Sequence, residues 1–321
     1  MQSKKALFLS ALLITPLVIG GSAFVAQSRT QAPLPPDRNW QELEQSINYQ
    51  IRHFPGQTAV YIRDLNTGWT IEHNTDVLFP SASLVKLPIM AVLYQAQVSG
   101  RLSLDESLPL LRKLKASGSG HLRFRRTGSR IRVRELIYKM ITESDNTATN
   151  MLTDRLDLDY INRHFLALGL NRTNFSRMIM DLRRRDQGIE NYTTAQDMGN
   201  LLEMIYFKNL TGSEEMLETL KNSKINDRLA MGIPSNWQIG HKTGLMNNAC
   251  HDVGIVFSPT HDYVICVLTT KARRFRRAKG FISEVSHLAA MYYSNPSLQA
   301  AARPKPSFWT QLFQISGDTR G

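Results

Sequence analysis

The period of the hydrophobic pattern changes twice along this 321-residue chain, and these changes constrain the fold more than any other feature. Strand-like alternation covers residues 57–74, helical spacing runs over residues 81–222, and strand-like runs return over residues 233–270. Strands on both sides of a helical insert predict one antiparallel sheet assembled from both ends of the chain. We therefore expect an α/β fold of the α+β type, with a five-stranded antiparallel sheet and an all-helical lobe.

Two helices should flank this sheet, one near each end of the chain. Asp37 can cap a helix over residues 39–54, and a second helical pattern covers residues 281–293. The apolar stripe of the first helix consists of Trp40, Leu43, Ile47, Ile51 and Phe54. Because pockets form where elements of different kinds meet, we expect an active site in the crevice between the sheet and the helical lobe.

Residues 1–38 carry the pattern of an export signal and a linker. A Lys-Lys pair precedes an uncharged run over residues 6–26, and the proline-rich stretch TQAPLPPDR follows. The run is long enough to stay as a signal anchor, while its GSA sequence also fits the cleavage site of a signal peptide. We expect an exported protein, periplasmic or extracytoplasmic, with one domain over residues 39–294 and a C-terminal tail over residues 295–321.

Cys250 and Cys266 are the two cysteines, and export raises the possibility of a disulfide between them. They fall on two strands of one predicted hairpin, which turns near Pro259. Pairing outward from that turn places Cys266 opposite Val253 or Gly254, several residues away from Cys250. We therefore expect two buried free thiols.

Basic residues give the chain a formal net charge of +12 and gather in residues 123–134, 183–185 and 273–279. Such clusters can bind nucleic acid, but export separates the chain from it, so we expect no nucleic-acid partner. Anionic wall polymers or lipid headgroups are the matching partners outside the cytoplasm. A generally basic, solvated surface is the alternative.

Three short motifs with reactive side chains each occur once. They are Ser83-x-x-Lys86 at the start of the first helix of the lobe, Ser144-Asp145-Asn146 after a helix, and Lys242-Thr243-Gly244 in a strand. The first motif alone decides nothing, because a Ser and a Lys at this spacing are common on solvated helix faces. In this order, on three elements that border the predicted crevice, the motifs resemble those of class A serine β-lactamases and penicillin-binding DD-peptidases. The resemblance covers residues 40–294 and includes stretches such as GRLSLDES and ENYTTAQDM.

The first motif can pair a nucleophile with a base. A serine hydroxyl is a weak nucleophile at neutral pH, so its attack needs a group that takes the proton. Ser83 and Lys86 project from the same face of a helix. Lys86 can be that base once burial and a second cation lower its pKa, and the resemblance implies that Lys242 supplies the second charge.

The resemblance also implies an oxyanion hole and a proton donor. The backbone N–H groups of Ser83 and Leu245 would bind the developing negative charge. Gly244 would let a ligand approach the strand closely. Ser144 would pass a proton to the departing nitrogen, with Lys242 beside it.

The resemblance also implies that two further residues bind the substrate. Asn146 would hydrogen-bond the amide of the substrate side chain, and Thr243 with Lys242 would hold the substrate carboxylate. Asp145, between Ser144 and Asn146, is expected to be structural.

One part of the chain departs from the family pattern. Class A β-lactamases carry a deacylating Glu on a loop after the second motif, whereas here that stretch reads SRMIMDLRRRDQGIENYTTAQDM and lacks the pattern. Asp181 lies at a suitable interval and is the candidate deacylation base, with pairing to Arg183 or Arg184 as its alternative role; Glu190 does not lie at that interval. An acyl-serine ester persists unless some group activates water, so the departure places efficient β-lactam turnover in doubt.

The resemblance implies a serine hydrolase that forms an acyl-enzyme through Ser83 with a β-lactam or a D-alanyl peptide. Three functions stay open: β-lactam hydrolysis, D-alanyl-D-alanine carboxypeptidase activity on peptidoglycan peptides, and a penicillin sensor that is acylated without turnover. The histidines form no HExxH or His-x-His cluster, so we expect neither a metal nor another cofactor. We expect a monomer.

Overall fold

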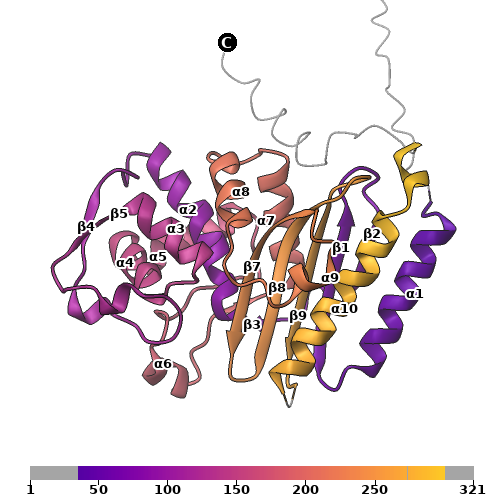
Figure 1. The fold of residues 1–321 in the computed structure, drawn as a ribbon. Coiled ribbons are helices and arrows are strands. Elements are labelled where there is room, and N and C mark those ends of the chain that lie inside the picture. The colour runs from indigo at the N-terminus through magenta and orange to yellow at the C-terminus, as the bar shows by residue number, and fades with distance from the viewer. Residues whose placement is uncertain (1–34, 273, 301–321) are drawn as a thin grey trace, which may run out of the picture. The chain divides into compact units, whose positions relative to one another are not determined.

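The computed structural model describes residues 35–272 and 274–300. These residues form an antiparallel sheet in the order β2-β1-β9-β8-β7, in which strands from both ends of the chain are neighbours (Figure 1). The strands are β1 (Gln57–Asp64), β2 (Thr70–His73), β7 (Gln238–Met246), β8 (Ala249–Phe257) and β9 (Tyr263–Thr270). The predicted α/β fold with a five-stranded antiparallel sheet is confirmed.

The sheet is buried on both faces, which explains why its strands are nearly continuous apolar runs. Successive side chains of a strand point to opposite faces. In β1, Val60 and Ile62 enter one hydrophobic core, whereas Ala59 and Tyr61 enter the other. The sheet therefore separates two cores, one shared with the terminal helices and one shared with the lobe.

The terminal helices α1 (Arg38–His53) and α10 (Phe275–Tyr293) pack against each other on one side of the sheet (Figure 1). The side chain of Asp37 accepts a hydrogen bond from the backbone N–H of Trp40 at 2.7 Å, which confirms the predicted cap. The rings of Trp40 and Tyr292 meet edge to face, with centroids 5.3 Å apart. The short helix α9 (Leu229–Gly232) packs on α10.

The lobe on the other side is built around α2 (Lys86–Val98), which is buried on nearly all sides and follows the 3-10 turn η1 (Ala82–Val85). The remaining helices are α3 (Val133–Thr142), α4 (Asn146–Leu156), α5 (Leu158–Ala167), α6 (Leu182–Asp186), α7 (Ala195–Tyr206) and α8 (Ser213–Lys221). Further 3-10 turns are η2 (Arg112–Leu114), η3 (Leu122–Phe124) and, outside the lobe after α10, η4 (Pro296–Ala300).

The lobe is not wholly helical, unlike the prediction. It contains the two-stranded ladder of β4 (Ser107–Pro109) and β5 (Arg130–Arg132), and β6 (Tyr192–Thr193) pairs with β3 (Phe79–Pro80) at its border. Strands of two or three residues are too short to show a period of two, so the sequence pattern could not reveal them.

Cys250 and Cys266 are both free and buried, as predicted. In the β8–β9 ladder, Cys266 lies opposite Val253 and Cys250 lies opposite Thr269. The two thiols thus occupy different register positions of the same hairpin.

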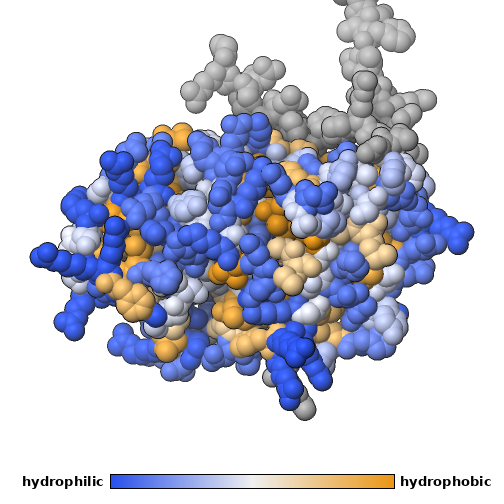
Figure 2. All heavy atoms as spheres, viewed as in Figure 1, coloured by the Kyte–Doolittle hydropathy of each residue, from blue (hydrophilic) through white to orange (hydrophobic). Residues whose placement is uncertain are grey.

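On the face shown in Figure 2, hydrophilic side chains predominate and apolar ones are interspersed among them.

The predicted leader, most of the proline-rich linker and residues 301–321 of the predicted tail lie outside the described residues. Within residues 35–272 and 274–300, no helix combines the length and the apolar character that crossing a membrane requires.

Tyr61 and Glu203 join the sheet to helix α7 of the lobe. The Tyr61 hydroxyl donates a hydrogen bond to Glu203 Oε1 at 2.6 Å, and Arg63 Nε lies 3.1 Å from Glu203 Oε2. Burial raises the pKa of both the Tyr61 hydroxyl and the Glu203 carboxyl. The ring of Tyr61 fills the space beside Gly199, where an added Cβ would lie only 2.4 Å from Tyr61 Cδ1.

Two helical glycines should therefore respond oppositely to replacement by alanine. Gly199→Ala should lower the free energy of unfolding by about 1 to 3 kcal/mol, because the buried Tyr61 ring has no room to move away. Gly280→Ala on α10, where a Cβ meets no atom within 4 Å, should raise it by roughly 0.5 to 1 kcal/mol through helix propensity. Urea unfolding of both variants tests this; a stabilised Gly199→Ala would contradict the packing.

Candidate active site

The segment that carries Ser83 is held in a strained conformation. The Ser81 N–H donates to the carbonyl of Asn191 at 2.7 Å, which continues the β3–β6 ladder. Ala82 then adopts a φ of 47°, a region that residues with a side chain seldom enter. Ser83 follows in η1 and is partly exposed, whereas α2 begins only at Lys86. The nucleophile candidate thus sits in a tight turn before the helix rather than in its first α-helical turn.

Lys86 is fully buried, and its amine contacts the second motif. Lys86 Nζ lies 2.6 Å from the Ser144 carbonyl oxygen, 2.7 Å from Asn146 Oδ1 and 3.2 Å from Ser144 Oγ. A neutral amine has two N–H donors and one lone pair. If the two carbonyl-type oxygens take the two donors, the lone pair is left to accept a proton from a hydroxyl.

Lys242 reaches the same hydroxyl from the sheet. Its Nζ lies 3.1 Å from Ser144 Oγ and 2.9 Å from the Thr243 carbonyl oxygen. Ser144 adopts a φ of 54°, another rarely populated conformation for a non-glycine residue. The hydroxyl of Ser144 therefore lies between two buried amines that come from α2 and β7.

Burial lowers the pKa of both amines. The pKa of Lys86 lies well below its ordinary value because of burial and then of the nearby charge of Lys242, with Asp145 acting in the opposite direction. Burial lowers the pKa of Lys242 to about 7, the Asp252 carboxylate opposes this, and the Arg228 guanidinium adds to it. Lys242 can therefore exchange protons near neutral pH, and the lowered pKa of Lys86 favours its neutral, basic form.

Asp145 and Asn146 hold the second motif in place. Asp145 caps α4 by accepting from the Ala148 N–H at 2.8 Å, and it also accepts from the Leu122 N–H at 2.9 Å. Asn146 binds Lys86 through Oδ1 and donates from Nδ2 to the Ser117 carbonyl at 2.7 Å. Both ends of the Asn146 amide thus have partners inside the protein.

The third motif, Lys242-Thr243-Gly244, packs directly on η1, the turn that carries Ser83. An added Cβ at Gly244 would lie 3.2 Å from Leu84 Cγ and 3.3 Å from the Ser81 carbonyl oxygen, so β7 and η1 approach closely. Thr243 is buried, whereas Leu245, which follows Gly244 along β7, is 45% exposed. The strand thus becomes exposed one residue beyond the close approach of Gly244 to η1.

The structure thus joins Lys86, Ser144, Asn146 and Lys242 in one hydrogen-bonded group. Ser83 lies three residues before Lys86, and among the described residues its hydroxyl has no hydrogen-bond partner. The motif residues come from three distant parts of the sequence, as the expected crevice requires.

His251 is a residue that the motifs did not reveal. Its Nε2 donates to the Pro80 carbonyl at 2.9 Å, and its Nδ1 accepts from the Thr269 N–H at 3.1 Å. Only the neutral ring with a proton on Nε2 satisfies both contacts. Burial lowers the pKa of His251 to about 4, so the ring is neutral at physiological pH. In the β7–β8 ladder His251 lies opposite Gly244, a position that a lone histidine in the sequence does not reveal.

Arg228 is a second residue that the sequence did not reveal, because it belongs to no motif. It is 2% exposed, its Nε donates to Cys250 Sγ at 3.3 Å, and its Nη1 lies 3.5 Å from Asp227 Oδ1. The guanidinium thus places a positive charge near Lys242, which helps to lower the pKa of that amine.

The candidate deacylation base lies at the start of α6. Asp181 Oδ1 accepts from the Arg184 backbone N–H at 3.1 Å, and the side chain is partly exposed. The predicted alternative partner was an arginine side chain, but the structure shows a helix cap instead. Met180, just before it, has a φ of 65°.

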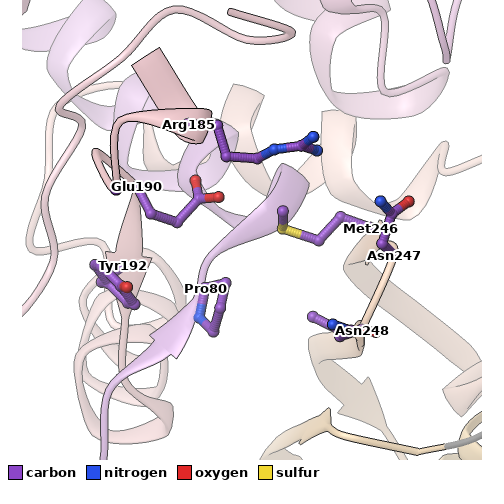
Figure 3. A pocket seen from close by; sticks show the side chains of 9 residues that line it. Pro80, Arg185, Glu190, Tyr192, Met246, Asn247 and Asn248 are labelled. Atoms are coloured by element: carbon purple, nitrogen blue, oxygen red, sulfur yellow. The ribbon is translucent and has the colours of Figure 1, made fainter. Parts of the chain in front are cut away.

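A pocket of about 330 Å³ is lined by Pro80, which lies three residues before Ser83 (Figure 3). Pro80, Arg185, Glu190, Tyr192 and residues 246–249 contribute to its wall. Glu190 lies 2.6 Å from Arg177 Nη2 and accepts from the Asn191 N–H at 2.7 Å.

Comparison with known proteins gives consistent results. A family model described as the β-lactamase enzyme family matches residues 42–293. A β-lactamase of Streptomyces lavendulae is 27% identical over 268 residues, covering 78% of this chain and 83% of that protein. A ROB-1 β-lactamase of Haemophilus influenzae is 26% identical over 254 residues, covering 77% and 79%.

Solved structures agree with the sequence relatives. PBP-A superposes with a TM-score of 0.74 at 28% identity, covering 81% of this chain and 98% of that one. A variant of PBP-A was solved as an acyl-enzyme complex with penicillin G. A β-lactamase of Sphaerobacter thermophilus superposes with a TM-score of 0.73 at 27% identity, covering 79% and 98%.

The depressed pKa of Lys242 should appear in the pH dependence of stability. Below pH 7 the folded and unfolded states both hold the proton, whereas between about 7 and the ordinary 10.5 only the unfolded state does. The free energy of unfolding should therefore rise over this range, by at most about 1.4 kcal/mol per pH unit for one group. Lys242→Met should lose this contribution. Parallel stability curves of the wild type and the variant from pH 7 to 9 would contradict the buried, deprotonated amine.

His251 should matter for the nucleophile and not only for stability. His251→Leu removes the donor to the Pro80 carbonyl and should slow labelling by a fluorescent penicillin by about tenfold to a hundredfold, because small displacements of reacting groups are costly. His251→Gln offers an amide donor and should recover most of the rate. A leucine variant that melts earlier but is labelled at the wild-type rate would show a purely structural role.

Proposed function

This chain belongs to the β-lactamase enzyme family and is a serine hydrolase, and we propose that it forms an acyl-enzyme on Ser83 with β-lactams and releases the product slowly. The observation that carries the proposal is the Ser144 hydroxyl between the amines of Lys86 and Lys242. This arrangement offers a path for a proton from the nucleophile to the leaving nitrogen.

In the proposed reaction, neutral Lys86 takes the proton of the Ser83 hydroxyl as the Ser83 oxygen bonds to the β-lactam carbonyl carbon. The N–H groups of Ser83 and Leu245 bind the resulting oxyanion. The C–N bond then breaks, and its nitrogen takes the proton of Ser144, which is in turn reprotonated by Lys86. Each amine ends the step in its starting state.

The carboxylate of the substrate is assigned to the end of the site where β7 lies. Lys242 is buried there, Thr243 is its neighbour, and Arg228 adds positive potential. A bound carboxylate would favour the protonated form of Lys242. Binding of an anionic substrate would thus increase the protonated, positively charged fraction of Lys242.

The environment of Asp181, the candidate deacylation base, supports slow release of the product. One carboxylate oxygen of Asp181 accepts the hydrogen bond that caps α6, and Glu190 forms an ion pair with Arg177. A D-alanyl-D-alanine carboxypeptidase acting on peptidoglycan peptides is the second candidate function, because that activity uses the same three motifs without a Glu on this loop. A penicillin sensor that is acylated without turnover is the limiting case. The likeness to PBP-A, of which a variant was solved as an acyl-enzyme complex with penicillin G, supports acylation by a penicillin.

We also propose export to the periplasm or another extracytoplasmic space, with the domain acting as a monomer. The Lys-Lys pair and uncharged run of residues 6–26 support export. The exposed basic side chains of α6 would face anionic wall polymer or lipid headgroups.

Intact-mass measurement over time after addition of benzylpenicillin tests the acyl-enzyme. The wild type should gain the mass of one penicillin and lose it slowly, whereas Ser83→Ala should gain none. Ser81→Ala, which removes the neighbouring hydroxyl, should still be acylated. An adduct on Ser83→Ala would place the nucleophile elsewhere.

A second assay, release of D-alanine from a D-alanyl-D-alanine peptide, separates the carboxypeptidase from the β-lactamase.

Asp181→Asn tests the deacylation base without removing the helix cap, because Asn caps helices about as well as Asp. Acylation should be unchanged and the lifetime of the adduct should lengthen, by about tenfold or more if the carboxylate is a general base. Asp186→Asn removes an exposed carboxylate of the same short helix and serves as the control. Equal adduct lifetimes in Asp181→Asn and the wild type would exclude Asp181 from the mechanism.

A further inference from the structure

The pocket lined by Pro80, Arg185, Glu190, Tyr192 and residues 246–249 lies next in sequence to both parts of the proposed oxyanion hole. Pro80 lies three residues before Ser83, and Met246 directly follows Leu245, so the pocket wall continues both halves of the proposed oxyanion hole. A substrate whose carbonyl oxygen rests on those two N–H groups has its remaining substituents directed along the adjoining wall. Figure 3 shows Arg185 reaching from α6 toward Met246 and Asn247 across this space.

The two charged side chains that line the pocket, Arg185 and Glu190, differ in how firmly they are paired. Glu190 is neutralised by Arg177, since their side chains are only 12% and 7% exposed and their atoms lie 2.6 Å apart. Arg185 has a weaker partner: its Nη2 lies 3.4 Å from an oxygen of Asp186, whose side chain is 71% exposed. Exposed pairs of this kind contribute little and leave the cation available. The guanidinium of Arg185 is therefore the charged group of the pocket wall that is most available to a ligand.

The other polar groups of the wall suit the same kind of ligand. Asn247 and Asn248 are exposed amides on the β7–β8 turn, and Figure 3 places Asn247 near the end of the Arg185 side chain. Amide N–H groups and a guanidinium are donors to carboxylate oxygens. The only carboxylate among the lining side chains, Glu190, already has its partners.

We propose that Arg185 selects substrates whose acyl side chain carries a carboxylate, with this pocket as the binding site for that group. This rests on the proposed acylation of Ser83, whose failure would be seen separately as the absence of any penicillin adduct. A substrate with an ammonium group at the same place is repelled by the Arg185 guanidinium and is disfavoured.

Three penicillins with a common nucleus test the selection. Carbenicillin carries a carboxylate on the acyl side chain, ampicillin an ammonium group, and benzylpenicillin neither, so their second-order acylation rate constants isolate the side-chain charge. The wild type should prefer carbenicillin to ampicillin. Arg185→Gln should reduce this rate ratio by about fivefold or more at low salt, and added salt should reduce the wild-type ratio as well.

Arg183→Gln is the matched control, because it removes the same charge from the same short helix at a residue that does not line the pocket. It should leave the rate ratio within about twofold of the wild type, since exposed charges at longer range are screened. An unchanged ratio in Arg185→Gln, or an equal loss in Arg183→Gln, would overturn the assignment while benzylpenicillin acylation still supported the proposed function.

Discussion

Two buried lysine amines that share one serine hydroxyl are the interaction on which the rest of this structure depends. Removing an ammonium group from water is costly, so a folded protein keeps such groups only where they lose their protons or gain close partners. Here Lys86 and Lys242 have both: the pKa of each is lowered, and each contacts Ser144. The two amines come from α2 and β7, so the hydroxyl between them joins the lobe to the sheet.

The backbone around this group is strained where the chemistry requires it. Ala82 and Ser144 both have positive φ angles although neither is glycine. Such conformations persist only when neighbouring contacts determine them. For Ala82 those contacts are the β3–β6 ladder, the His251 hydrogen bond to Pro80 and the close packing of Gly244 on η1. The core of the sheet thereby fixes the position of a turn at its edge.

Sequence reasoning predicted the parts of this molecule that have a long period or a distinctive motif. The five strands, α1 with its Asp37 cap and the free thiols followed from periodicity and register, and the three motifs lie around one site. It missed His251 and Arg228, because a single residue carries no pattern and its partners, Pro80 and Cys250, are distant in sequence or on another element. It also missed the β3–β6 pairing, since two-residue strands have no detectable period.

Direct titration of the lysine side chains by NMR, through their Cε and Nζ resonances, tests the central claim most directly. Loss of one resonance in Lys86→Met and another in Lys242→Met would assign the two buried amines. The account predicts that both titrate far below the ordinary pKa of 10.5, with Lys242 near 7. If both resonances titrated together with the exposed lysines near that ordinary value, the amines would be charged cations at neutral pH, and Lys86 could not take the proton of Ser83.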